Sequence, residues 1–263
     1  GFRARQLYCG APSRAVSLGL ATSIGLVAVR TQLGDSKPIN VYDAAASRNN
    51  IGVLREQLED RMASLDETDE LGRTLLVRAL LRVGAPFASR ADAVELVRTL
   101  VDAGAPVTAA DELGHSPLHY AAALNAVDVV ELLLSGLVDV GALDAGGNSP
   151  LHYANVEVAE VLLAHGASAM APNAASYTPI HAASAADNLA LLEVLLDTAG
   201  VTFPLTPSAL DLALLSRARR TSELLMHRSS LTPISLHAAA LGGDGIIVSR
   251  VIGAQRMTSG YRG

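Results

Sequence analysis

Apolar positions along this chain come in pairs of short stretches separated by turns. In the clearest copy, a short apolar stretch begins at Ser116 and Pro117, and a second one follows at 129–134 after a turn near Asn125. Serine is a good helix N-cap, and proline at the first helical position loses no hydrogen bond. The second stretch is apolar almost all round, so as a helix it must be buried. The pattern predicts pairs of packed antiparallel helices.

The paired pattern recurs at a nearly fixed interval. The hexapeptide Ser-Pro-Leu-His-Tyr-Ala occurs at 116–121 and again at 149–154. An interval of this size is typical of stacked repeats, in which a single unit cannot bury its apolar face alone. Such stacks present extended surfaces that bind other proteins. The sequence therefore predicts an all-α solenoid.

These repeat starts, together with the related Thr-Pro-Ile-His-Ala-Ala at 178–183, resemble the ankyrin repeat. Its signature is a Thr-Pro-Leu-His-x-Ala start, two antiparallel helices and a hairpin loop. The resemblance covers about residues 41–255 and implies an ankyrin-repeat solenoid of about seven helix-turn-helix units with hairpin loops and degenerate ends. Residues 1–40 are then a separate N-terminal segment, and residues 256–263 form a C-terminal tail.

Two intervals depart from the one between the identical hexapeptides. The interval from Thr74 to Ser116 is longer, and we expect the excess near 84–89 to lengthen the turn between paired helices. The interval from Ser149 to Thr178 is shorter by about one helical turn, which predicts a clipped first helix. Such irregularity indicates a stack shaped to one particular partner.

The N-terminal segment contains an uncharged apolar run. Residues 15–29 carry no charge and are flanked by Arg14 and Arg30. As a helix this run spans roughly 23 Å, less than the ~30 Å core of a bilayer. Snorkelling of Arg14 would extend it, which gives a candidate transmembrane helix at about 12–31. A retained membrane anchor is favoured; a targeting peptide and a packed soluble helix remain open alternatives.

Charge and cysteine content exclude several classes of function. The single Cys9 excludes an intrachain disulfide framework and a cysteine-based zinc site. Residues 99–216 hold 13 acidic residues and no Lys or Arg, so binding of nucleic acid through this region is excluded by charge repulsion. The acidity is either an ordinary solvated surface or a face complementary to a basic partner, and both interpretations remain open.

The histidines carry no sign of catalysis. His119, His152, His181 and His237 occupy the same place in successive units. In the ankyrin family this position is structural, its ring bonding within the hairpin and to the neighbouring unit. Equal spacing along a stack does not bring ligands together around one metal. We therefore predict no catalytic site, no metal or other cofactor and no small-molecule substrate.

Partners of ankyrin proteins usually contact the hairpin tips and the exposed side of the first helices. The matching positions predicted to bind a partner are Glu112, Leu113, His115, Leu124, Leu143, Asn148 and Tyr177. Several of the positions on this face are apolar or small, which favours a permanently covered surface over a transient one.

The leading hypothesis is a non-catalytic accessory subunit of an organellar membrane complex. Its partners would be other protein subunits, and the membrane contact would come through residues 12–31. The mitochondrial inner membrane, with its respiratory chain, is favoured over the chloroplast. The alternative is a soluble, cytoplasmic ankyrin adaptor whose N-terminal segment is a targeting peptide or a capping helix.

Overall fold

The computed structural model describes residues 65–84, 90–199, 209–215 and 218–228, with isolated positions at 52, 55, 58 and 249. Within these residues every regular element is a helix, and the one β interaction is an isolated bridge between Thr68 and Thr74. This confirms the all-helical prediction for the described part of the chain. The described residues up to 168 belong to one compact unit, and those from 169 onward belong to a second.

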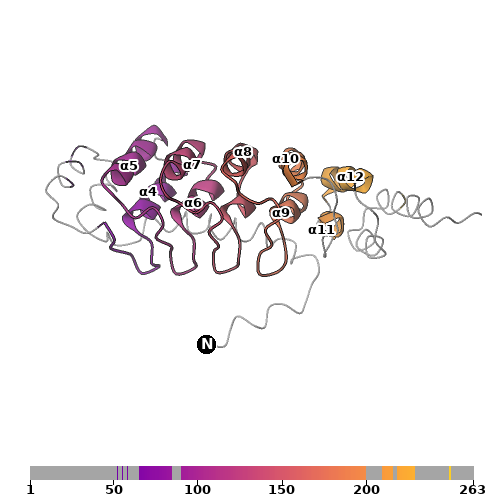
Figure 1. Ribbon diagram of the computed structural model, residues 1–263, viewed down its shortest axis with the longest axis horizontal. Coiled ribbons are helices and arrows are strands. Elements are labelled where there is room, and N and C mark those ends of the chain that lie inside the picture. Colours follow the sequence, from indigo (N-terminus) through magenta and orange to yellow (C-terminus); the bar gives the residue numbers. More distant parts are fainter. Residues whose placement is uncertain are drawn as a thin grey trace, which may run out of the picture. The chain divides into compact units, whose positions relative to one another are not determined.

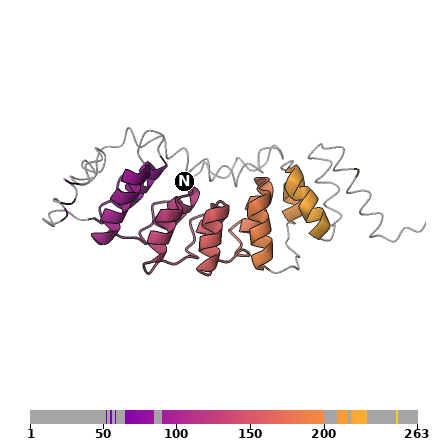
Figure 2. The same cartoon turned by 90° about the horizontal axis from the view of Figure 1, so that it is seen from above.

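The described part of the first unit contains three pairs of helical elements (Figure 1). They are α4 (Leu75–Val83) with α5 (Arg90–Asp102), α6 (Pro117–Ala123) with α7 (Val127–Leu134), and the 3₁₀ helix η2 (Pro150–His152) with α8 (Val156–Ala164). The first members, α4, α6 and η2, pack in one layer, and α5, α7 and α8 pack side by side in the other (Figure 2). Leucine and valine side chains fill the space between the layers. Among them are Leu80, Leu96, Leu118, Val130 and Leu162, each fully buried.

The second unit is likewise built from short packed helices in the part that the structure describes. It contains α9 (Pro179–Ala185), α10 (Leu189–Ala199), α11 (Ala209–Leu215) and α12 (Arg219–Arg228). Helix α9 packs against α10 and α11, and α12 packs against α10 and α11. The core again consists of aliphatic side chains, including Ile180, Leu192, Leu195, Leu210 and Leu225.

The helix starts follow from local sequence. Ser116, Ser149 and Thr178 are N-caps in extended backbone conformation, and each is followed by a proline. At α4 the Thr74 hydroxyl accepts a hydrogen bond from the backbone N–H of Val77 at 3.4 Å. Such caps contribute about 1 kcal/mol each.

The short unit has the clipped first helix that its spacing predicts. Element η2 is a single 3₁₀ turn, and α8 begins almost at once behind Asn155, whose side chain accepts from the N–H of Val158 at 2.9 Å. The second helix therefore keeps its full length and its place in the outer layer.

In the unit that begins at Thr74, part of the extra length lies in the second helix. Helix α5 has 13 residues whereas α7 has 8, so part of the excess lengthens the second helix. Residues 85–89 of the turn lie outside the described residues.

Several predictions fall on other residues that the structure does not describe. These are the N-terminal hydrophobic helix at 12–31, most of the first predicted unit at 41–64, and the final unit with His237. Among the residues that are described, no helix has both the length and the apolar character needed to cross a membrane.

Candidate partner-binding surface

Each hairpin loop that the structure describes in the first unit is built on an aspartate. The three loop aspartates are Asp69, Asp111 and Asp144. One oxygen of each carboxylate accepts hydrogen bonds from the backbone N–H groups two and four residues later, at 2.8–3.0 Å. The residue three positions later is a glycine with positive φ in all three loops. Asn173 makes the same turn in the second unit, with Ser176 in the glycine position at φ 65°.

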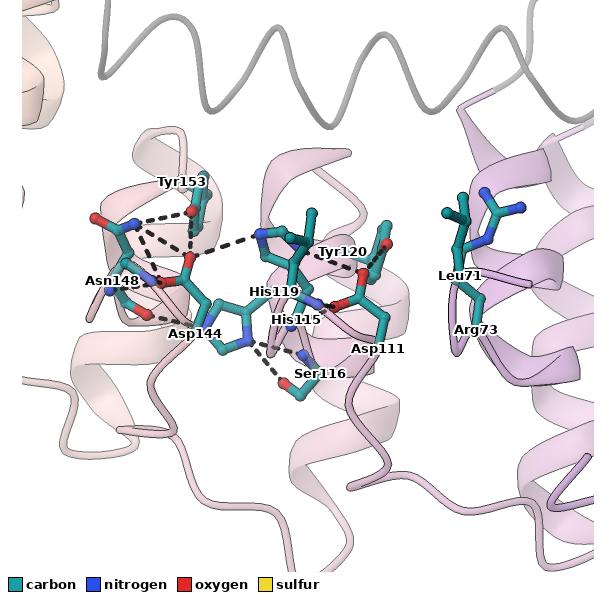
Figure 3. A network of polar contacts seen from close by, with 12 residues as sticks. Leu71, Arg73, Asp111, His115, Ser116, His119, Tyr120, Asp144, Asn148 and Tyr153 are labelled. Carbon is teal, nitrogen blue, oxygen red and sulfur yellow. Dashed lines mark hydrogen bonds and ion pairs between the residues drawn. The ribbon is translucent and has the colours of Figure 1, made fainter. Parts of the chain in front are cut away.

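The other carboxylate oxygen is held by a side chain nine residues further along. Arg78 lies 3.4 Å from Asp69. The Tyr120 hydroxyl donates to Asp111 at 2.6 Å, and the Tyr153 hydroxyl donates to Asp144 (Figure 3). Position 182, nine residues after the neutral Asn173, is alanine. A buried carboxylate needs more hydrogen-bond donors than a neutral amide does. The loops built on an aspartate therefore have a donor side chain nine residues later, whereas the loop built on Asn173 has alanine there.

His115 joins two neighbouring hairpins. Its Nδ1 lies 3.2 Å from Asp111 Oδ2, and its Nε2 lies 3.6 Å from Asp144 Oδ2 (Figure 3). The ring meets Tyr120 and Tyr153 edge to face, with centroid distances of 5.8 and 6.2 Å. Because its side chain is only 13 % exposed, His115 acts mainly as a link between successive repeats.

His119 links the same two repeats from below the loops. Its Nδ1 accepts from the backbone N–H of Ser116 at 3.1 Å, and its Nε2 donates to the carbonyl of Asn148 at 3.0 Å. A carbonyl can only accept, so the proton must be on Nε2 and Nδ1 must stay free to accept. His152 and His181 accept from the backbone N–H groups of Ser149 and Thr178 in the same way, each at 3.0 Å.

Burial and hydrogen bonding shift the pKa values of these groups. Burial raises the pKa of Asp69, Asp111 and Asp144, but the donors around each carboxylate outweigh it, so all three pKa values are lowered. Burial lowers the pKa of His119, and the Asn148 carbonyl only partly opposes this. Burial and the Asp111 carboxylate raise the pKa of Tyr120, which keeps its hydroxyl a donor.

We expect the free energy of unfolding to fall as the pH falls below neutrality. The unfolded chain takes up a proton at His119 near its ordinary pKa of 6.5, above the folded value, so stability is lost below that pH. The three aspartates add a second loss, which begins near the unfolded pKa of 3.8 and continues as the pH falls through the lowered folded values. Urea denaturation at a series of pH values measures both losses. Stability that stayed constant or rose on acidification would contradict this sign.

The tips of the loops are tied together by backbone hydrogen bonds. The N–H of Glu112 donates to the carbonyl of Leu71 at 3.2 Å, and the N–H of Ala145 donates to the carbonyl of Leu113 at 2.9 Å. These fixed tips expose aliphatic side chains: Leu71 is 40 % exposed, Leu113 is 58 % and Leu143 is 57 %. We call Leu71, Leu113 and Leu143, together with Glu112, the tip surface.

A family model described as ankyrin repeats (3 copies) matches residues 41–144 and 86–173, which together make up just over half of the chain. This chain belongs to the ankyrin repeat family. The resemblance seen in the sequence is thereby confirmed. Ankyrin repeat domains are generally non-catalytic modules that bind other proteins. No curated protein matches the chain.

The ankyrin loops place the seven predicted partner-binding residues in different surroundings. Glu112, Leu113 and Leu143 are exposed on the tips, whereas Leu124, at the C-terminal end of α6, is half-buried. Tyr177 in the second unit is half-buried too, with its ring against His181 at 5.7 Å. For all five, a role in binding stays a prediction.

Asn148 and His115 lie inside the loop network instead of on its surface. Asn148 is 8 % exposed, and its amide donates to Asp144 and to the Tyr153 hydroxyl. The carboxylate of Asp144 draws the amide inward because a buried charge needs every available donor. In the structure Asn148 and His115 hold the tips in position, and for these two residues as well a role in partner binding stays a prediction.

Leu71 is a tip residue that the sequence analysis did not single out. The signal for it was present, because Asp-Glu-Leu-Gly occurs at both 69–72 and 111–114. The tyrosines beneath the loops were also missed, although their spacing of nine residues from an aspartate repeats along the chain. Among the described residues, no group of three or more His, Cys, Asp or Glu side chains could hold a metal ion.

Proposed function

We propose that this protein is a non-catalytic interaction subunit that binds a partner protein through the tip surface. The observation that carries the proposal is the exposure of Leu113 and Leu143 on loops fixed by buried hydrogen bonds. Burying a leucine side chain is worth roughly 1.5–3 kcal/mol. Loops that are already rigid lose little conformational entropy when they bind, so most of that free energy is available for affinity.

The partner is proposed to be bound permanently, as in a stable complex. Three leucines gather on neighbouring loops, and an apolar surface of this kind favours a protein that is seldom free in solution. Rigid tips also suit one partner of fixed shape better than many partners. A transient adaptor would expose more charge at these positions.

The complex is proposed to be an organellar membrane complex, with the mitochondrial inner membrane favoured. Support comes from the sequence of residues 1–34, which holds four arginines, no acidic residue and an uncharged run at 15–29. Carbonate extraction of membranes tests this: the chain should stay in the membrane fraction, and deletion of 1–34 should release it. A chain that is extracted, and that keeps its partner without residues 1–34, would instead support the soluble adaptor.

Charge introduced at the tip surface should release the partner. We expect the double variant Leu113→Glu, Leu143→Glu to reduce co-purification of the native partner by about tenfold, since central apolar contacts dominate most interfaces. The control is Leu137→Glu, which places one such charge on a leucine that is fully exposed in the turn after α7. Partner recovery measured by quantitative mass spectrometry should fall for the tip variant alone. Equal recovery from both variants would rule out the tip surface.

A further inference from the structure

The three hairpin loops of the first unit differ in how their buried aspartates are balanced. Asp69 pairs with two guanidinium groups, Arg73 at 2.6 Å and Arg78 at 3.4 Å. All three carboxylates accept backbone N–H groups, but the side chains that donate to Asp111 and Asp144 include the neutral hydroxyls of Tyr120 and Tyr153 and the amide of Asn148. The ring of His115 is shared between these two aspartates.

Negative charge therefore stays at the second and third loops. Neutral donors stabilise an ionised carboxylate but do not cancel its charge. Residues 99–168 contain no lysine or arginine. Arg73, which acts electrostatically on Tyr120 from the preceding loop, already pairs with Asp69. The exposed carboxylate of Glu112 lies at the tip of the second loop and adds to this field. Fixed charges of one sign attract mobile groups of the opposite sign over several ångströms.

The exposed leucines stand within this negative field. Leu113 is two residues beyond Asp111, and Leu143 directly precedes Asp144. The backbone bond from Ala145 to Leu113 keeps the two loops together. An apolar contact and a site for positive charge are thus built on the same pair of loops.

We propose that the surface around Leu113 and Leu143 receives a segment of the partner protein in which aliphatic side chains alternate with lysine or arginine. This rests on the proposed function and names the chemistry of the partner. The aliphatic side chains cover the two leucines, and the cationic ones pair with Glu112 and lie in the field of Asp111 and Asp144. Complementary charge speeds encounter and disfavours acidic partners.

The test is selection of random dodecapeptides displayed on phage, with the full chain in detergent micelles as the target. Selected peptides should be enriched in both aliphatic and basic residues. Glu112→Lys should weaken their binding about tenfold at low salt and less at high salt, because salt screens exposed charges. The matched control is Glu131→Lys, the same change of charge on the exposed side of α7, and it should alter affinity less than about twofold.

Three results would overturn the proposal. The selected peptides could lack basic residues, the Glu131 variant could weaken binding as much as the Glu112 variant, or the chain could cover its own leucines by forming a dimer that blocks the peptides. The proposed function itself fails if the native partner still co-purifies with the Leu113→Glu, Leu143→Glu variant. Loss of the partner in that variant, combined with selection of uncharged or acidic peptides, would refute the charge proposal alone.

Discussion

Replacing His119 with alanine is expected to lower the free energy of unfolding by roughly 3–5 kcal/mol. The ring is fully buried and spans two repeats. Its loss leaves the buried N–H of Ser116 without the acceptor Nδ1, at about 1–3 kcal/mol. It also removes one of the hydrogen bonds to the carbonyl of Asn148, which keeps the bond from the backbone N–H of Asp144. The cavity left by the ring adds a further cost, because the surrounding helices cannot fully collapse into it.

Urea denaturation followed by circular dichroism measures the effect, and His165→Ala is the control. His165 is exposed in the turn after α8, where its ring bonds to the carbonyl of Val161 within its own helix. Its replacement should cost no more than about 0.5 kcal/mol. If the two variants were equally stable, the ring of His119 would not couple neighbouring repeats, and the loops would need another explanation for their order.

The second large effect is expected at Gly114. Its φ of +80° disfavours any residue with a Cβ, and a Cβ there would lie 2.8 Å from the backbone nitrogen of Ala145. That nitrogen belongs to the neighbouring loop and donates to the carbonyl of Leu113, so it cannot retreat without breaking a hydrogen bond. Gly114→Ala should therefore lower the free energy of unfolding by roughly 2–4 kcal/mol.

Gly104 offers a matched comparison for this variant. It has nearly the same φ, +87°, but a Cβ added to it would meet nothing within 4 Å. Gly104→Ala should cost only the backbone strain, about 1 kcal/mol. The difference between the two variants in denaturant midpoint isolates the close approach of the loops. Equal midpoints would mean that the tips are not held against each other, and that Leu113 is not presented on a fixed loop.

Much of the helical architecture could be predicted from sequence because its signals are local. A Ser-Pro or Thr-Pro start fixes a helix N-terminus within a few residues, and an apolar second stretch identifies the buried helix. The short interval from Ser149 to Thr178 led correctly to the shortened η2, since only one turn of helix was missing. The effect of the long interval from Thr74 to Ser116 was harder to predict, because added residues can lengthen either a turn or a helix. Part of the added length lies in α5.

The candidate site was less predictable because it depends on contacts between loops. Asn148 occupies a hairpin position that looks exposed in the sequence, but the carboxylate of Asp144 holds its amide inside. His115 looks like an isolated surface histidine, and its role depends on an aspartate in the next repeat. Such pairings become visible only when successive repeats are stacked. A closer comparison of repeats would have found the tyrosines that follow Asp111 and Asp144 by nine residues.

The most direct test of the tip surface as the partner-binding site is site-specific photo-cross-linking of the full chain in the cells that make it. A photoreactive side chain is placed at position 113, at 143 or, as the control, at 137, and adducts are identified by mass spectrometry. We predict that positions 113 and 143 cross-link to the same partner protein and that position 137 does not. The claim would be contradicted if only position 137 gave cross-links. It would also be contradicted if the partner co-purified with the chain but formed no adduct with position 113 or 143.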